Sequence, residues 1–96
     1  MDEPGIRPGA LVRSLAGRDR GHRYVVLRLV DGRRVTVCNG TDRTVERPKI
    51  KNRKHLEVLG WAEYTLSERL TRGDRVADLM IEQALSAIPP RVIEEV

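Results

Sequence analysis

The sequence predicts a small, mainly β domain, in which five short strands form a closed or half-closed barrel, followed by one or two short helices. Two patterns lead to this prediction. Runs of alternating apolar residues separated by turn signals fill residues 10–60, and apolar residues recur at helical spacing in the last third. Five short strands in so short a stretch favour closure, because a closed sheet leaves no exposed edges. We therefore expect a flexible N-terminus (1–8), a barrel (9–60) and a helical extension (61–96) packed on it.

The first three strands are predicted from runs of β-branched residues. They are ALVRSL (10–15), RYVVLRLV (23–30) and RVTVC (34–38). Asp31-Gly32 separates the second run from the third, and this dipeptide is typical of a type I′ hairpin turn, which needs positive φ at both central positions. The three strands are therefore expected to be antiparallel neighbours.

Two further strands are predicted in the second half of the barrel. Asn39-Gly40 marks a turn, and RTVE (43–46) is read as a short fourth strand that ends before Pro48, since proline cannot donate to a ladder. HLEVLG (55–60) alternates apolar and polar residues and is read as the fifth strand.

The last third predicts two helices. TLSERL (65–70) begins with a threonine and has a glutamate three residues later, which is the spacing of a capping box, and Gly73 then breaks the helix. Asp78 is expected to cap the second helix (79–88), and Pro89-Pro90 stops it. A short one-sided helix needs a surface to pack on, and the barrel provides one.

The positive charge of the chain is concentrated in its first two thirds. Residues 1–60 contain 14 Lys and Arg against 7 Asp and Glu, whereas residues 61–96 contain 4 against 7. An asymmetry of this kind points to a polyanionic partner for the N-terminal part.

A glycine loop (17–21) precedes the second strand. Gly17 and Gly21 allow the backbone to turn sharply, and guanidinium groups around such a turn suit phosphate oxygens. The alternative is an ordinary solvated hairpin loop. The cationic candidates at this loop are Arg18, Arg20, His22 and Arg23.

The segment from Gly9 to Val30 resembles a KOW motif, the strand–loop–strand of several ribosomal proteins and transcription elongation factors. Its matching features are Gly9, Val12, the Gly17-x-Asp19-x-Gly21 loop and Val26. Tyr24 stands where many KOW motifs have another glycine, as in the branch similar to ribosomal protein L14e.

A second block, CNGTDRTVERPKIKNRKHLEVLG, is similar to bacterial relatives of L14e described as KOW-domain RNA-binding proteins. With this block the resemblance covers about residues 9–59. It implies an SH3-like barrel that binds ribosomal RNA or another structured RNA. KOW domains elsewhere also bind proteins, so the ligand stays open.

A basic run (43–55) continues the candidate interface, and its single acid is Glu46. Pro48 stiffens its path, and Lys49 and Lys51 alternate as in an extended chain. Contacts of such residues with phosphates supply affinity without reading sequence. The alternative is a solvated linker whose charge aids solubility. The candidates here are Arg43, Arg47, Lys49, Lys51, Arg53 and Lys54, with Arg13, Arg33 and Arg34 in second rank; His55 faces RNA or caps the neighbouring strand.

The chain has only three aromatic residues, Tyr24, Trp61 and Tyr64. Tyr24 is expected in the core or at an edge, and Trp61 is expected to pack the helices on the barrel. So few aromatics favour recognition of RNA shape and backbone over stacking on single-stranded bases. They also argue against a groove for proline-rich peptides.

We expect no enzyme, cofactor, metal or membrane span. Cys38 with His22 or His55 could be drawn as a nucleophile and base, but a small thiol at the end of a β run is more often buried. A single cysteine and two distant histidines lack metal-ligand spacing and suit a reducing cytoplasm.

The sequence thus predicts a cytoplasmic RNA-binding protein whose partner is a structured RNA, and the resemblance implies ribosomal RNA. The alternative is a protein-interaction module, in which the barrel or the acidic helical tail docks on a translation or transcription partner.

Overall fold

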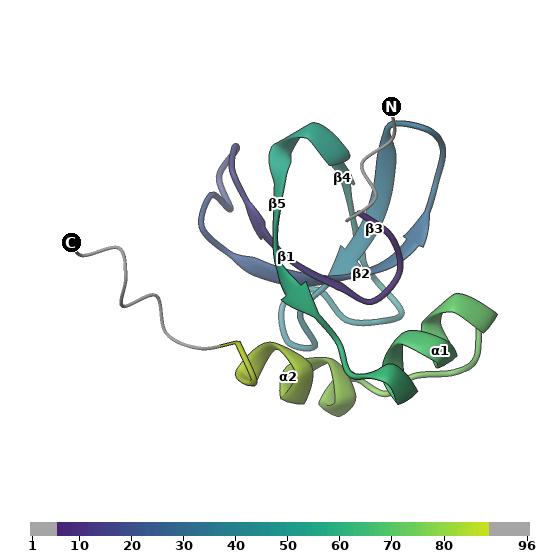
Figure 1. The fold of residues 1–96 in the computed structure, drawn as a ribbon. Helices are drawn as coiled ribbons and strands as arrows, with labels where there is room; N and C mark the ends of the chain where they lie inside the picture. Colours follow the sequence, from purple (N-terminus) through teal and green to yellow (C-terminus); the bar gives the residue numbers. More distant parts are fainter. Residues whose placement is uncertain (1–5, 89–96) are drawn as a thin grey trace.

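A computed structural model describes residues 6–88 and contains one five-stranded antiparallel sheet with two helices against it (Figure 1). A single turn of 3-10 helix, η1, joins the last two strands. The elements in chain order are β1 (Ala10–Ser14), β2 (Arg23–Leu29), β3 (Arg34–Cys38), β4 (Lys49–Asn52), η1 (Arg53–His55), β5 (Leu56–Trp61), α1 (Tyr64–Arg72) and α2 (Asp78–Ser86).

The strands follow the order β4-β3-β2-β1-β5, so β4 and β5 form the two edges of the sheet. Each neighbouring pair is antiparallel, and the register shifts between Leu11 and Val12 in β1 and between Val26 and Arg28 in β2. Such irregularities bend strands. The sheet curls strongly (Figure 1), but no ladder between β4 and β5 closes it in residues 6–88.

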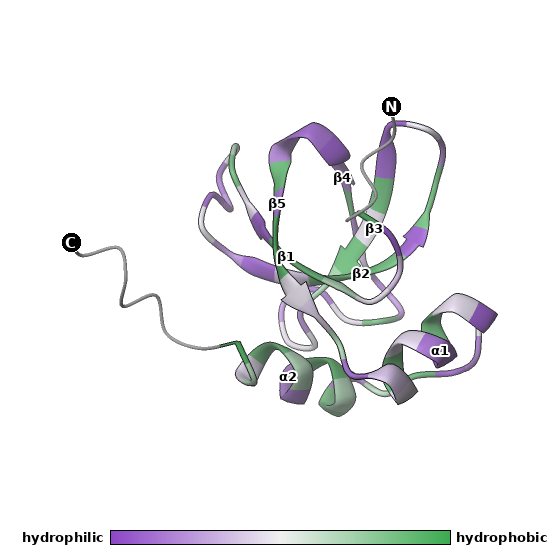
Figure 2. Ribbon diagram, viewed as in Figure 1, coloured by the Kyte–Doolittle hydropathy of each residue, from purple (hydrophilic) through white to green (hydrophobic). Residues whose placement is uncertain are grey.

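The two faces of the curled sheet bury different apolar clusters. The inner cluster includes Val12, Val26 and Val37, and the outer cluster includes Leu11, Val25 and residues of both helices, such as Ile81. Alternation along β1 and β2 therefore supplies both clusters, as strand geometry requires. Figure 2 shows the hydrophobic colour along the strands and much of α2, and the hydrophilic colour over the turn between β4 and β5.

The predicted fourth strand is wrong. Residues 43–46 belong to the β3–β4 loop (39–48), and the strand forms six residues later as β4. Val45 is half-buried against the outer cluster, and its backbone N–H donates to Asp78 Oδ1 at 2.8 Å. Val45 thus anchors the loop on α2 and does not extend the sheet.

The β2–β3 hairpin is confirmed, but its type I′ turn is wrong. Neither Asp31 nor Gly32 has a positive φ. The Asp31 carboxylate instead accepts the backbone N–H groups of Arg33 and Arg34 at 2.8 and 2.9 Å, so a side chain takes over part of the turn's hydrogen bonding.

Both predicted helices form, but neither is capped as predicted. Thr65 lies inside α1, whose N-cap is Glu63, and Asp78 is the first residue of α2, whose N-cap is Ala77. Gly73 does end α1, with a φ of 79°. The predicted stop at Pro89-Pro90 lies outside the described residues.

The segment before β1 is held more firmly than the sequence predicts, because Ile6 is buried in the inner cluster. Neither helix in residues 6–88 has the length and apolar character needed to cross a membrane.

Candidate nucleic-acid interface

The glycine loop (17–21) joins β1 to β2 at one end of the sheet. Gly17 and Gly21 have φ values of 90° and 89°, a region that glycine enters without strain. Backbone hydrogen bonds close the loop: Gly21 N–H donates to Ser14 O at 2.8 Å, and Arg20 N–H donates to Gly17 O at 3.2 Å. The side chains of Arg18 and Arg20 are left exposed.

Asp19, the one acid of the glycine loop, points into the protein and is only 6% exposed. Its carboxylate accepts four hydrogen bonds from side chains, namely from Ser14 Oγ at 2.9 Å, Tyr24 OH at 2.7 Å, Lys49 Nζ at 3.0 Å and Lys51 Nζ at 3.0 Å. We call these five residues the Asp19 cluster. It ties the loop to β4, a strand about 30 residues away along the chain.

The protonation of the Asp19 cluster follows from its contacts. Burial alone would raise the pKa of the Asp19 carboxyl, but hydrogen bonds from Tyr24, Lys49, Lys51 and Ser14 outweigh it and hold this pKa well below its usual range. Burial, together with the Asp19 charge, raises the pKa of Tyr24. The cluster is therefore a carboxylate held by two ammonium groups and two hydroxyls at neutral pH.

The cluster changes the expected roles of two predicted phosphate ligands. Lys49 and Lys51 pair with Val37 and Val35 on β3, so both face the inside of the sheet while Ile50 between them is exposed. The side chains of Lys49 and Lys51 are 28% and 9% exposed, and both ammonium groups bind Asp19. The structure assigns these two lysines to the interior, so we leave them out of the interface.

The 3-10 turn η1 connects the glycine loop to the β2–β3 loop (30–33). On one side, Leu15 N–H donates to His55 O at 2.8 Å; on the other, Arg53 N–H donates to Arg33 O at 2.7 Å. Arg53 Nη1 also donates to Gly32 O at 2.9 Å. The glycine loop, η1 and the β2–β3 loop therefore form one continuous edge.

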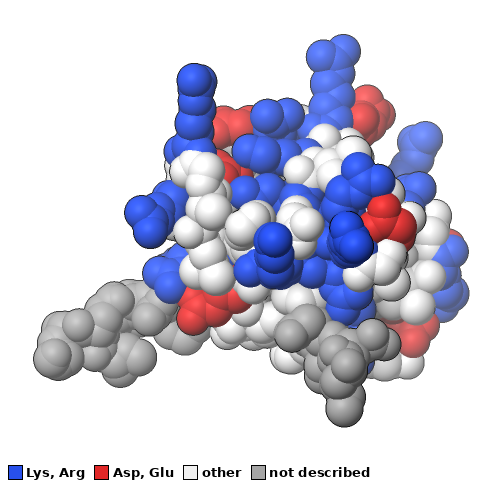
Figure 3. Space-filling view, turned by 90° about the horizontal axis from the view of Figure 1, so that it is seen from above, with Lys and Arg blue, Asp and Glu red and all other residues white. Residues whose placement is uncertain are grey.

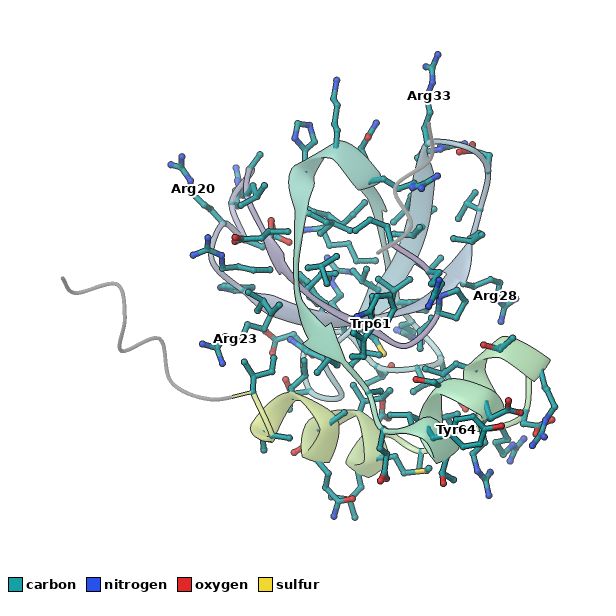
Figure 4. All side chains as sticks on the ribbon, viewed as in Figure 1. Arg20, Arg23, Arg28, Arg33, Trp61 and Tyr64 are labelled. Atoms are coloured by element: carbon teal, nitrogen blue, oxygen red, sulfur yellow. The ribbon has the colours of Figure 1, made fainter. Side chains whose placement is uncertain are left out.

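Cations of all three segments lie on this edge, which we call the basic rim. It consists of Arg18, Arg20, Arg33, Arg53 and Lys54, all of them exposed except the half-buried Arg53. Figure 3 views the molecule from this end and shows Lys and Arg over much of the face, with acidic groups scattered between them. In Figure 4, Arg20 and Arg33 project from opposite sides of the same end, away from both helices.

Two acids near the basic rim, Asp31 and Glu57, are already paired. Asp31 binds the Arg34 guanidinium at 2.8 Å. This ion pair, together with hydrogen bonds from the backbone N–H groups of Arg33 and Arg34, lowers the pKa of Asp31 to about 2. Glu57 pairs with Arg13. Within residues 6–88, the side chains of Arg18, Arg20, Arg33 and Lys54 make no ion pair, so their charge is available to a partner.

Three other predicted cations, Arg23, Arg43 and Arg47, lie away from the basic rim. Arg43 and Arg47 are exposed on the β3–β4 loop, which Asp78 holds against α2. Arg23 is half-buried at the start of β2 and points away from the rim in Figure 4. His22 is exposed directly after the glycine loop.

From the sequence, Arg33 is ranked too low as a candidate phosphate ligand, and the structural role of Asp19 is missed. Arg33 is a second-rank candidate in the sequence because the direction in which it faces depends on strand register, yet it lies on the rim. Asp19 was noted only as part of the loop motif. The signal available was a lone acid between two glycines, facing a Lys-x-Lys run with an apolar residue between the lysines.

The remaining reactive groups do not form a second chemical site. Cys38 is buried in the outer cluster, and burial, with the nearby Asp78 charge, raises the pKa of its thiol to about 12. Across residues 6–88 no group of three His, Cys, Asp or Glu side chains is placed to hold a metal ion. Tyr24 is a core residue, which settles the open choice between core and edge.

No model of a known protein family matches this sequence, and a search of curated proteins gives no significant match.

Proposed function

We propose that this protein binds structured RNA in the cytoplasm and that the basic rim is the surface that contacts the phosphates. The observation that carries the proposal is the meeting of three separate segments at one end of the sheet. There four side chains present cations that form no ion pair with any residue in 6–88. The sequence supplies these cations from positions 18, 20, 33 and 54, which only the fold makes neighbours.

The side chains of the rim suit contacts with the phosphate backbone of RNA better than contacts with its bases. Three of its four unpaired cations are arginines, whose planar guanidinium groups bind phosphate oxygens in a bidentate manner. The rim itself contains no aromatic side chain on which a base could stack. Recognition by shape and phosphate spacing, as in structured RNA, is therefore the mode that we propose for it.

The finer structural identity is part of the same proposal. A curled five-stranded antiparallel sheet with a glycine loop between its first two strands is compatible with an SH3-like barrel that carries a KOW loop. Ribosomal RNA is the partner class implied by the resemblance to the L14e branch. We propose no catalysis, since the thiol of Cys38 is buried and protonated at neutral pH.

The proposal is tested by removing the rim charge and measuring binding. Arg18, Arg20, Arg33 and Lys54 are changed together to alanine, and the affinity for a labelled RNA hairpin is measured by fluorescence anisotropy at low salt. Because all four side chains are exposed and unpaired, the variant should fold normally. We expect a loss on the order of 100-fold or more, since the released counterions supply most of such affinity.

A matched control removes four charges elsewhere. Arg28, Arg43, Arg47 and Arg75 are also exposed, but they lie off the rim, and their change to alanine alters net charge by the same amount. We expect this variant to bind within a few-fold of the wild type. Equal losses in the two variants would mean that net charge, not the rim, holds the RNA. If the folded rim variant still associates fully with ribosomes, docking on a protein partner is the better account.

A further inference from the structure

Two of the three aromatic side chains of this chain lie on its surface, away from the basic rim. Trp61 is 45% exposed and Tyr64 is 77% exposed, whereas Tyr24 is buried. Fully burying a large apolar side chain stabilises a fold by roughly 1.5–3 kcal/mol. This chain has no phenylalanine and few large apolar side chains for its core. Two aromatic rings left on the surface therefore indicate a binding role for that surface.

The two rings are carried by one short, anchored stretch of the chain. Trp61 is the last residue of β5, and Tyr64 is the first residue of α1. The short connection is fastened at Ala62, whose N–H donates to Gly9 O at 2.8 Å and whose carbonyl accepts from Ser67 Oγ at 3.1 Å. Figure 4 shows both rings on the same side of the molecule.

Arg7 completes the arrangement from the segment before β1. Its guanidinium carbon lies 4.7 Å from the centroid of the Trp61 ring, which is a cation–π contact. Arg7, Trp61 and Tyr64 line one hollow of about 170 Å³, together with Pro8, Ser67 and Thr71. Glu68 borders the hollow as well, and its nearby carboxylate raises the pKa of Tyr64.

The residues that line the hollow suit one flat ligand with polar edges. A guanidinium plane stacked on an indole and a second aromatic ring nearby are the surfaces on which unpaired nucleic-acid bases stack. The hydroxyl of Thr71 and the Glu68 carboxylate offer hydrogen bonds to the edge of a base. The hollow is too small for an extended peptide, which would need a long groove.

We propose that Arg7, Trp61 and Tyr64 form a stacking site for one unpaired RNA base, separate from the phosphate contacts of the basic rim. The inference rests on the proposed RNA binding and deepens it. The preferred RNA is then a structured one with an unpaired base, for example in a bulge or a loop. A continuous duplex would contact the basic rim but would leave the stacking site empty.

The test uses Trp61 as its own reporter, because it is the only tryptophan in the chain. Labelled single-stranded oligoadenylate and a labelled blunt RNA duplex are each titrated at low salt, with anisotropy measuring binding and tryptophan fluorescence measuring stacking. We expect both RNAs to bind and only oligoadenylate to quench Trp61. Tyr64→Ala should weaken oligoadenylate binding about 5- to 100-fold, which corresponds to the stacking energy of one base. Tyr64→Phe keeps the ring and should bind like the wild type, and neither change should affect the duplex.

The outcomes separate the two proposals. If both RNAs bind but Trp61 fluorescence and the Tyr64→Ala affinities are unchanged, the stacking site is refuted and the rim stands. If neither RNA binds, the proposed function itself fails. If a proline-rich peptide alters Trp61 fluorescence and oligoadenylate does not, the site belongs to a peptide and the base assignment is overturned.

Discussion

Replacing Asp19 with asparagine tests whether the Asp19 cluster holds the glycine loop in place. The change keeps the shape of the side chain but removes the charge that two ammonium groups bind at 3.0 Å. Lys51 is then a buried cation without a counterion, because its side chain is only 9% exposed. Removing one partner of a buried ion pair costs roughly 3–5 kcal/mol.

The expected loss for Asp19→Asn lies at the low end of this range, about 3 kcal/mol. Lys49 is partly exposed and recovers water, and the amide oxygen of asparagine can still accept from Ser14 and Tyr24. For a domain of this size, about 3 kcal/mol corresponds to a fall in Tm of roughly 12–24 °C. Urea denaturation followed by Trp61 fluorescence gives the free energy of unfolding directly.

A double-mutant cycle with Lys51→Met identifies the cause. Methionine retains most of the apolar stem of the lysine and removes the buried charge, so the double variant should be more stable than the sum of the single losses predicts, by at least about 1 kcal/mol. Additive losses, or a cost of less than about 1 kcal/mol for Asp19→Asn, would refute the idea that this ion-pair cluster secures the loop.

Three further predictions concern the fold. The pKa of Asp19 is lower in the folded protein than in the unfolded chain, where it is about 3.9. The stabilisation from the Asp19 carboxylate should therefore be complete above this unfolded pKa and be lost as the pH falls below it. Urea midpoints measured from neutral to strongly acidic pH should show this loss of stability, and the loss should be smaller in Asp19→Asn. Gly40→Ala should destabilise the protein by more than about 2 kcal/mol, because φ is 84° and the new Cβ would lie 2.7 Å from Asp78 O. Gly21→Ala should cost only about 1 kcal/mol, because φ is 89° but the space around the new Cβ is open. Similar urea midpoints for the two variants would contradict this prediction. Cys38 should not react with a thiol reagent in the folded protein at neutral pH and should react fully in urea, so rapid labelling of the native state would be inconsistent with its burial.

The strands that could be predicted are those in which alternation and burial agree. β1, β2 and β3 follow apolar runs whose alternate residues enter the two clusters, and β5 contributes Leu56 and Val58 to the inner one. Hydrophobic pattern alone therefore located these strands within a residue or two. The glycine loop was equally visible, because Gly17 and Gly21 do adopt positive φ.

The fourth strand was misplaced because its inward residues are charged. Lys49 and Lys51 face the inside of the sheet, and a pattern of buried lysines around an exposed Ile50 reverses the usual rule that apolar residues point inward. The rule fails here because Asp19 supplies the counter-charge from a loop far away in the sequence. No local propensity carries that information.

Only part of the basic rim could be predicted from the sequence. The cations of the glycine loop were expected to share one positive surface with Arg53 and Lys54, and the fold brings Arg18, Arg20, Arg53 and Lys54 to the same end of the sheet. The run of six cations at 43–54, however, divides among three places: the helix side of the sheet, its interior and the rim. Strand register decides which side chains share a surface, and a basic run reveals its register only when the pairing is known.

The salt dependence of RNA affinity tests the account most directly, because it counts the phosphates that the basic rim neutralises. If about five phosphates are contacted, the slope of log K against log salt should be about −3.5 for single-stranded RNA. Changing Arg18, Arg20, Arg33 and Lys54 to alanine should bring that slope close to about −1, while the variant at Arg28, Arg43, Arg47 and Arg75 should keep the wild-type slope. A slope that is unchanged in the rim variant, or lost equally in the control, would contradict the assignment of the rim.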